Sequence, residues 1–251
     1  MVNLNNDLGN FIEYKSLGTI NNSTDAANFI NRYGLNTDKP KGIRLGNYVT
    51  INTNAGYHDN RWMYIGHDIK YNVGDTPLTS HHGGFIPYTY LLNSVMNSSN
   101  TTEGGFVGSK MFTETLPSID THLKNVLGSH ILKWKALLSN SVNNDMNSMA
   151  GANWKGAANN WTWTDVYSCL LTEVEVYGST VLSSSLYDTG DGCHILPYFS
   201  FTNHTSTEER FSFWLRCVTG STYFALADGN GIAGGSNASN SRGVRPLILL
   251  G

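Results

Sequence analysis

Residues 211–250 read FSFWLRCVTGSTYFALADGNGIAGGSNASNSRGVRPLILL, and no other stretch of the chain carries so strong a structural pattern. Three runs within it, FSFWLRCV, STYFALA and GVRPLILL, are rich in the aromatic and β-branched residues that favour strands. TG separates the first two runs. DGNGIAGGSNASNSR separates the last two, and its Asp-Gly and Asn-Gly pairs suit the positive φ angles of a tight hairpin. The pattern predicts a C-terminal β-meander made of these three runs.

The N-terminal part of the chain predicts a short helix followed by a linker. In residues 21–33, NNSTDAANFINRY, Ser23 or Thr24 stands as an N-cap ahead of apolar residues at helical spacing. Residues 34–41 are polar and contain Pro40, which is typical of a linker. We therefore expect an N-terminal segment of residues 1–41 and one domain of residues 42–251.

The middle of the chain predicts a mixture of strands, helices and long loops rich in Asn and Gly. Residues 43–51 and 61–65 favour an opening hairpin, and residues 88–96 are expected to be helical. Apolar residues at mostly three- and four-residue intervals predict an amphipathic helix over 116–138, which Gly128 divides. Residues 140–160, dominated by Asn, Ser, Gly and Ala, predict a loop.

A strand-to-helix corner is predicted just beyond that loop. Residues 166–171 are typical of a buried strand. Thr172 and Glu175 have the spacing of a capping box, in which each side chain bonds to the other residue's backbone N–H group. A helical turn is therefore expected over residues 173–177.

The composition excludes several classes of protein. Charged residues make up 14% of the chain and the formal net charge is −3, so a basic surface that tracks nucleic-acid phosphates is not expected. No apolar run approaches the ~18 residues of a membrane span, and the N-terminus lacks the pattern of a secretion leader. Cys169, Cys193 and Cys217 lack the CxxC spacing of zinc sites, and their odd number argues against a disulfide framework.

Three motifs occur in a specific order: TEVEVYGS at 172–179, FWLR at 213–216 and GVRP at 243–246. This series resembles a domain family of unknown function that is widespread in phages and prophages of Gram-positive bacteria. That family is similar to the C-type-lectin-fold variable proteins of diversity-generating retroelements, which include the phage major tropism determinant, and to the formylglycine-generating-enzyme fold. The resemblance covers residues 42–251 and implies an α+β, C-type-lectin-like fold, while residues 1–41 have no counterpart in the family.

The resemblance also implies which residues are scaffold and which are exposed for binding. Trp214 is expected in the core, and Arg216 and Arg245 are expected to be held by backbone carbonyls and neighbouring carboxylates, with Gly243 and Pro246 completing the structural motif. The residues expected to contact a ligand are Thr219, Ser221, Tyr223, Asp228, Asn230, Asn237, Asn240 and Arg242. Tyr, Asn and Ser are also the residue types that antibody binding loops favour. The plainer alternative, an exposed meander rich in Asn and Gly without a ligand, stays open.

No metal site, cofactor or catalytic centre is expected. His81 and His82 stand near His67 and Asp68 in the sequence, but adjacent residues of an extended chain point to opposite sides, so both histidines cannot readily ligate one ion. The Asp-Gly-rich stretches at 188–192 and 228–231 lack the full ligand alternation of calcium loops and are interpreted as turns.

Catalytic patterns are equally absent from the sequence. Neither a nucleophile with its base nor a pair of carboxylates flanking a cleft is recognisable, and the capping box accounts for Glu173 and Glu175. The formylglycine-generating relatives use a cysteine pair near the C-terminus, where this chain has only Cys217. The chain is therefore expected not to be an enzyme.

The resemblance implies a bacteriophage virion protein that is assembled in the host cytoplasm and forms a homo-oligomer. Residues 1–41 are expected to dock it to other virion proteins or to hold the copies of the oligomer together. The leading hypothesis is receptor binding, as on a tail fibre, with a host-surface glycan or protein as the ligand. The alternative is decoration of the head or tail, with the lectin-like surface contacting neighbouring virion subunits. A weaker third hypothesis is an enzyme that degrades cell-wall glycans.

Overall fold

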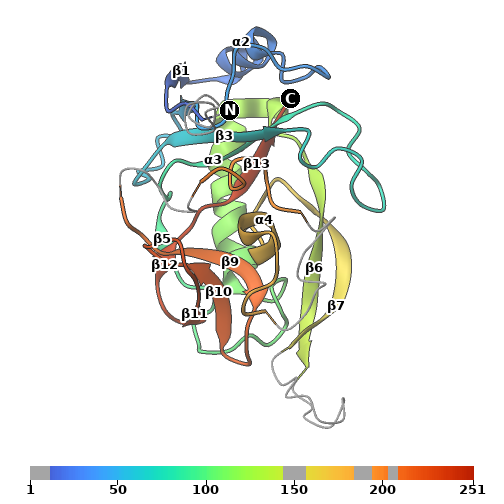
Figure 1. Ribbon diagram of the computed structural model, residues 1–251, viewed down its shortest axis with the longest axis vertical. Coiled ribbons are helices and arrows are strands. Elements are labelled where there is room, and N and C mark those ends of the chain that lie inside the picture. The colour runs from blue at the N-terminus through green and yellow to red at the C-terminus, as the bar shows by residue number, and fades with distance from the viewer. Residues whose placement is uncertain (1–11, 144–156, 184–193, 203–208) are drawn as a thin grey trace, which may run out of the picture.

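A six-stranded sheet organises one half of the described structure, residues 12–143, 157–183, 194–202 and 209–251 of a computed structural model (Figure 1). Its strands, in spatial order, are β1 (Ser16–Ile20), β2 (Tyr48–Ile51), β3 (Arg61–His67), β4 (Gly83–Pro87), β13 (Leu247–Leu250) and β8 (Ser168–Cys169). β1 runs parallel to β2, and the other neighbours are antiparallel. The β2–β3 pair confirms the predicted opening hairpin.

A five-stranded sheet forms the other half, and it contains the predicted meander in altered form (Figure 1). Its order is β11 (Ala233–Asn237), β10 (Tyr223–Ala227), β9 (Phe213–Val218), β12 (Arg242–Gly243) and β5 (Asn93–Ser94). The first two predicted runs pair as β9 and β10, but β11, predicted to be a turn, is the third strand of the meander.

The prediction that GVRPLILL forms the third strand of the meander is wrong. Only the first residue of this run, Gly243, belongs to β12, and its last four residues enter the six-stranded sheet as β13 between β4 and β8. All four residues of β13 are buried, and a continuous apolar run suits a strand that is covered on both faces of its sheet. The Gly-containing sequence of β11, AGGSN, lies instead at the edge of the meander.

The helices are short, and their ends follow from local sequence. α2 (Ser23–Tyr33) is the predicted N-terminal helix, but its N-cap is Asn22, whose side chain accepts a hydrogen bond from the Asp25 N–H group, and not Ser23 or Thr24. α4 (Glu173–Tyr177) has the predicted capping box in full. None of the described helices has the length and apolar character needed to cross a lipid bilayer.

The predicted helix over 116–138 is correct only in its first half. A π-helical turn (Met111–Thr115) leads into α3 (Leu116–Leu127), a 3-10 turn (Gly128–His130) follows, and residues 134–143 form β6 (Trp134–Asn143), which pairs with β7 (Ala157–Val166). Trp134, Ala136 and Leu138 are buried at a spacing of two, the period of a strand. β6 and β7 extend into the predicted loop 140–160, of which residues 144–156 lie outside the described part.

Residues 88–96, predicted to be helical, form no helix, and they contain β5. The buried strand predicted over 166–171 is present as β8 at residues 168–169. The described elements thus make an α+β structure in which strands predominate.

The N-terminal segment shares the sheet and the core of the remaining chain. β1 is the edge strand next to β2, and Ile20, Phe29 and Ile30 belong to the same hydrophobic cluster as Phe85 of β4. The rings of Phe29 and Phe85 lie 6.1 Å apart. The boundary predicted near Gly42 therefore does not separate two packing units, and residues 1–11 lie outside the described part.

Candidate binding surface

The motif residues lie inside the structure, where they bond within the five-stranded sheet and to the chain around the other sheet. Trp214 is fully buried, and its Nε1 donates to the Ser94 carbonyl oxygen at 2.9 Å. Arg245 is fully buried, and its guanidinium donates to the carbonyl oxygens of Pro87 and Tyr88 at 2.8 and 3.1 Å. Burial lowers the pKa of Arg245 to about 10. A buried arginine that bonds two carbonyls holds the segment between β12 and β13 in one position relative to β4.

Arg216, Gly243 and Pro246 are buried as well. Arg216 donates from Nη1 to the Leu170 carbonyl oxygen at 3.2 Å. The Gly243 N–H group donates to the Ser212 carbonyl oxygen at 2.9 Å, and a Cβ at Gly243 would lie 3.0 Å from that same oxygen. A side chain at this position would push Ser212 or Tyr90 away by a few tenths of an ångström, because β12 lies close to the chain entering β9.

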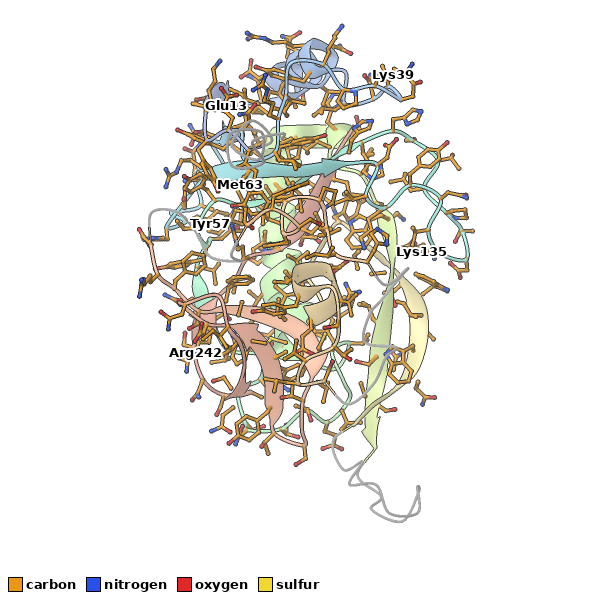
Figure 2. The ribbon with its side chains drawn as sticks, in the orientation of Figure 1. Glu13, Lys39, Tyr57, Met63, Lys135 and Arg242 are labelled. Carbon is orange, nitrogen blue, oxygen red and sulfur yellow. The ribbon has the colours of Figure 1, made fainter. Side chains whose placement is uncertain are left out.

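The eight residues predicted to contact a ligand are all at least partly exposed, but they form three groups. Thr219, Ser221, Tyr223 and Asn237 lie at one end of the meander, and we call these four residues the meander tip. Asp228 and Asn230 lie at the other end of β10, roughly 16 Å away by the rise of a strand. Asn240 lies between β11 and β12, and Arg242 is the first residue of β12 (Figure 2).

The meander tip meets a second loop, which sequence reasoning did not assign to the surface. The Asn100 side-chain amide donates to Asn237 Oδ1 at 3.0 Å. Thr102 donates from Oγ1 to the Gly220 carbonyl oxygen at 2.8 Å, and its N–H group donates to the Ser221 carbonyl oxygen at 3.0 Å. The polar stretch NSSNTTE at 97–103 was the available signal, but nothing in it indicates which strand it meets.

Buried polar groups hold this second loop in place. Asn97 is 8% exposed; its amide donates to the Thr101 carbonyl oxygen at 2.7 Å, and its Oδ1 accepts from the Lys110 N–H group at 2.9 Å. Thr102 is fully buried. Satisfied buried hydrogen bonds favour a single loop conformation. Tyr223, by contrast, is 44% exposed on this fixed frame.

The Asp228 group is a self-contained turn. Asp228 Oδ1 accepts from the N–H groups of Asn230 and Ile232 at 2.8 and 2.9 Å, and such hydrogen bonds hold the pKa of this carboxyl below its usual value. Arg210 donates to Asn230 Oδ1 at 3.1 Å. The polar groups of Asp228 and Asn230 are thus engaged in the turn and with Arg210. This confirms the interpretation of residues 228–231 as a turn.

Asn240 and Arg242 also make local contacts. The Asn240 amide donates to Ser236 Oγ at 3.0 Å, and Arg242 donates to the Ser241 carbonyl oxygen at 3.0 Å. Arg242 lies on the flank of the five-stranded sheet (Figure 2). Neither residue bonds to the tip side chains in these contacts.

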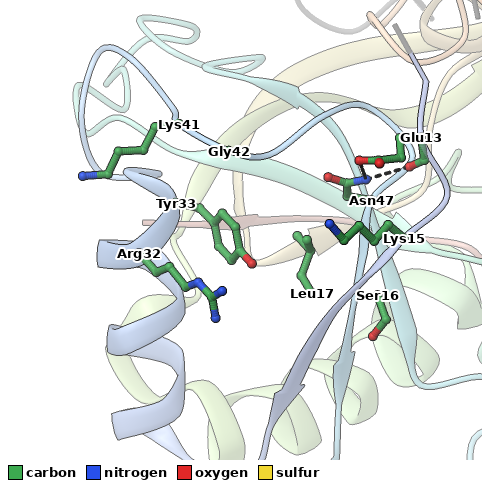
Figure 3. Close-up of a pocket in the computed structure, with 9 residues that line it drawn as sticks. All are labelled: Glu13, Lys15, Ser16, Leu17, Arg32, Tyr33, Lys41, Gly42 and Asn47. Atoms are coloured by element: carbon green, nitrogen blue, oxygen red, sulfur yellow. Dashed lines mark hydrogen bonds between the residues drawn. The ribbon is translucent and has the colours of Figure 1, made fainter. Parts of the chain in front are cut away.

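A pocket of about 500 Å³ lies at the opposite end of the structure, between β1 and α2 (Figure 3). Lys15, Arg32 and Lys41 contribute positive charge to its wall, while the one carboxylate, Glu13, accepts a hydrogen bond from the Asn47 amide at 3.1 Å. Sequence reasoning missed this pocket because its walls meet only when the N-terminal segment packs on the sheet.

The carboxylates of α4 are structural. Glu175 caps the helix, as predicted, and also bonds Lys70 Nζ at 2.5 Å in a buried ion pair. The prediction that Glu173 also belongs to the cap is wrong. Its carboxylate instead accepts hydrogen bonds from the N–H groups of Val181, Leu182 and Ser183. Both carboxylates are buried, so neither presents a free oxygen at the surface.

The predicted opposite orientation of His81 and His82 is confirmed. The His82 side chain is fully buried, whereas that of His81 is 31% exposed. However, His81 lies beside His67 and Asp68. Cys169 and Cys217 are buried free thiols, and Cys193 and residues 188–192 lie outside the described part.

Comparison of the chain with protein-family models, with curated proteins and with solved structures finds no match.

Proposed function

We propose that this protein is a surface protein of a bacteriophage virion, with a C-type-lectin-like domain that binds a host-surface glycan or protein through the meander tip. The proposal rests on the exposure of Tyr223. This side chain is 44% exposed, although the next four residues of its strand are buried. The phage origin rests on the resemblance of the three motifs to the phage and prophage family.

The rigidity of the tip supports a role in binding. Tyr223 is joined to the neighbouring strands by backbone pairing with Asn237 and by the hydrogen bond that its carbonyl oxygen accepts from the Thr219 N–H group. A backbone that is already held in position loses little conformational entropy when a ligand binds. Tyr also offers a large apolar face and a polar hydroxyl at the cost of only two rotatable side-chain bonds.

The chemistry around Tyr223 suits a polar ligand. Thr219, Ser221 and Asn237 contribute hydroxyl and amide groups, and Asn100 from the second loop adds another amide. An aromatic ring beside hydroxyl and amide groups can stack on an apolar face of a sugar while bonding its hydroxyls. The same arrangement fits a polar protein epitope, so a glycan and a protein are both retained.

The test measures binding of the full chain, labelled with a fluorophore, to a panel of Gram-positive cells and to an array of their wall polysaccharides. Tyr223→Ala is expected to weaken binding by about ten-fold or more, because central aromatic residues dominate interface energies. The matched control is Ile232→Ala: Ile232 is 63% exposed on the turn at the far end of the same meander. That variant is expected to bind like the wild type, and both should unfold at the wild-type temperature.

Wild-type binding by Tyr223→Ala, or an equal loss in both variants, would contradict a binding role for the tip. Self-association of the wild type that Tyr223→Ala abolishes, without binding to any cell or polysaccharide, would instead support contacts between virion subunits, as in a decoration protein.

A further inference from the structure

We propose that His67, Asp68 and His81 form a binding site for a divalent transition-metal ion, such as Zn²⁺ or Co²⁺, at the end of β3. One potential ligand atom from each of the three side chains lies within 4.8 Å of the other two. Imidazole nitrogen with one carboxylate oxygen is a donor set that zinc and cobalt accept, whereas calcium and magnesium prefer oxygen ligands. The site lies on the six-stranded sheet and is separate from the meander tip.

The backbone brings the three residues together from two segments. His67 is the last residue of β3, and Asp68 follows it with a φ of 53°, a left-handed conformation that Asp tolerates better than most residues. The Asp68 N–H group donates to the His82 carbonyl oxygen at 2.8 Å, and Asp68 Oδ1 accepts from the His82 N–H group at 2.9 Å. These two bonds hold the carboxylate beside the segment that carries His81.

The second carboxylate oxygen is the one that faces both imidazoles. Asp68 Oδ2 lies 3.5 Å from His67 Nε2 and 2.7 Å from His81 Nδ1. Ligands around a tetrahedral ion with bonds of ~2.0–2.1 Å are roughly 3.3–3.4 Å apart. The first separation already fits, and the second needs to open by about 0.6–0.7 Å as an ion replaces the hydrogen bond.

Contacts outside the three ligands hold the rings in position. The His81 ring stacks on Tyr71, with centroids 5.1 Å apart and planes 8° apart, and it is nearly parallel to the His67 ring. Asp68 Oδ1 is bonded to backbone, so Oδ2 is left to bind the ion. Such supporting contacts orient metal ligands and strengthen binding.

Exposure permits an ion to enter, and a fourth ligand is close by. The side chains of His67, Asp68 and His81 are 14%, 24% and 31% exposed. The Thr37 carbonyl oxygen accepts a hydrogen bond from His67 Nε2 at 2.7 Å, so it borders the site from the stretch that follows α2, and an ion bound to Nε2 would replace this bond. A bound ion would therefore link the N-terminal segment to the end of β3 and stabilise the fold by mass action.

The sequence analysis expected no metal site, because the adjacent His81 and His82 cannot both bind one ion. The structure agrees that these two side chains are apart, with His82 buried and His81 partly exposed. His82 has a different role: its Nε2 accepts from the Lys70 N–H group at 3.1 Å, and its Nδ1 bonds the Ser80 carbonyl oxygen. The second imidazole of the site comes instead from His67, fourteen positions earlier in the chain.

The test uses the full chain, freed of metal with EDTA and then titrated with ZnCl₂ by calorimetry and with CoCl₂ by visible absorption. The wild type is expected to bind one ion, to show the absorption bands of cobalt bound to nitrogen and oxygen, and to unfold at a higher temperature with Zn²⁺. His81→Ala is expected to bind Zn²⁺ at least ten-fold more weakly and to lose the shift in unfolding temperature.

The matched control is His58→Ala. His58 is also a partly exposed histidine, bonded to a carboxylate, Glu209, at 3.1 Å and stacked on a tyrosine, Tyr90, with centroids 4.2 Å apart. The described residues place no third ligand beside it in a group like that of His67, Asp68 and His81. This variant is expected to bind Zn²⁺ like the wild type.

Absence of Zn²⁺ and Co²⁺ binding at micromolar concentrations by the wild type would overturn the proposal. Undiminished binding by His81→Ala, or an equal loss in His58→Ala, would overturn it as well. If His81→Ala proves unfolded by circular dichroism, His81→Gln, which keeps a polar group of similar reach, provides the same comparison. The outcome does not depend on the function of the meander tip, because the tip is tested without added metal.

Discussion

Asp120 on α3 is a partly buried carboxyl group whose environment opposes ionisation. Burial raises its pKa to about 6, against the opposing charge of Lys124. The folded-state pKa is thus above the unfolded value, so the group contributes stability that is fully present below about pH 4. That contribution is lost as the pH rises through about 6.

Asp120→Asn is therefore expected to stabilise the protein at pH 7 by up to about 3 kcal/mol, because the amide has no charge to desolvate. At pH 4 the same substitution should have little effect. Urea unfolding at both pH values measures the difference, with Asp38→Asn, a change to an exposed carboxyl, as the control. A gain of equal size at both pH values would show that charge burial is not the cause.

At the scale of an element, α4 depends on its cap because five residues are too few for a helix to be stable alone. Thr172 Oγ1 accepts from the Glu175 N–H group at 3.1 Å, and Glu175 Oε2 accepts from the Thr172 N–H group at 2.7 Å. Both residues are buried, so water cannot replace either bond. The cap also holds Glu175 where it meets Lys70.

Thr172→Ala is expected to lower the free energy of unfolding by about 1–2 kcal/mol, because it leaves a buried N–H group without its acceptor. Thr172→Ser keeps the hydroxyl group and should lose less than half as much. Chemical denaturation of the two variants beside the wild type provides the measurement. Equal losses would mean that the methyl group of Thr172, and not its hydroxyl, is what stabilises α4.

At the scale of the whole molecule, the N-terminal segment belongs to the main core. Ile20, Phe29, Ile30, Tyr33 and Leu35 are all at most 8% exposed, and they pack in the same cluster as the strands of the six-stranded sheet. Burying each such side chain stabilises a protein by about 1.5–3 kcal/mol, and whole domains have only about 5–15 kcal/mol of net stability.

A fragment of residues 42–251 is accordingly expected to lack a cooperative thermal transition, because it loses β1 and α2 and exposes the surface that they cover. Calorimetry and near-ultraviolet circular dichroism of the fragment and of the full chain test this expectation. A fragment that unfolds cooperatively within a few degrees of the full chain would instead establish residues 42–251 as an independent domain.

Sequence reasoning succeeded where the determining contacts are local. The capping box of Thr172 and Glu175 joins residues three positions apart, α2 follows from a few apolar positions and its caps, and the β2–β3 hairpin joins neighbouring strands. In each case the hydrogen bonds or the apolar periodicity can be read within a short window of sequence. Residues 131–138 show the limit of this approach, because their apolar spacing suits either a helix or a strand until a partner strand is known.

The sequence by itself therefore determined a mixture of strands and helices, the α4 corner and the first two strands of the meander. Only the tertiary structure decided that β13 leaves the meander for the other sheet, that Asn100 meets Asn237, and that His67 and Asp68 meet His81. The physical reason is that these contacts join residues far apart in the chain. Their formation depends on which surfaces the whole core buries, and no local hydrogen bond or periodicity specifies that choice.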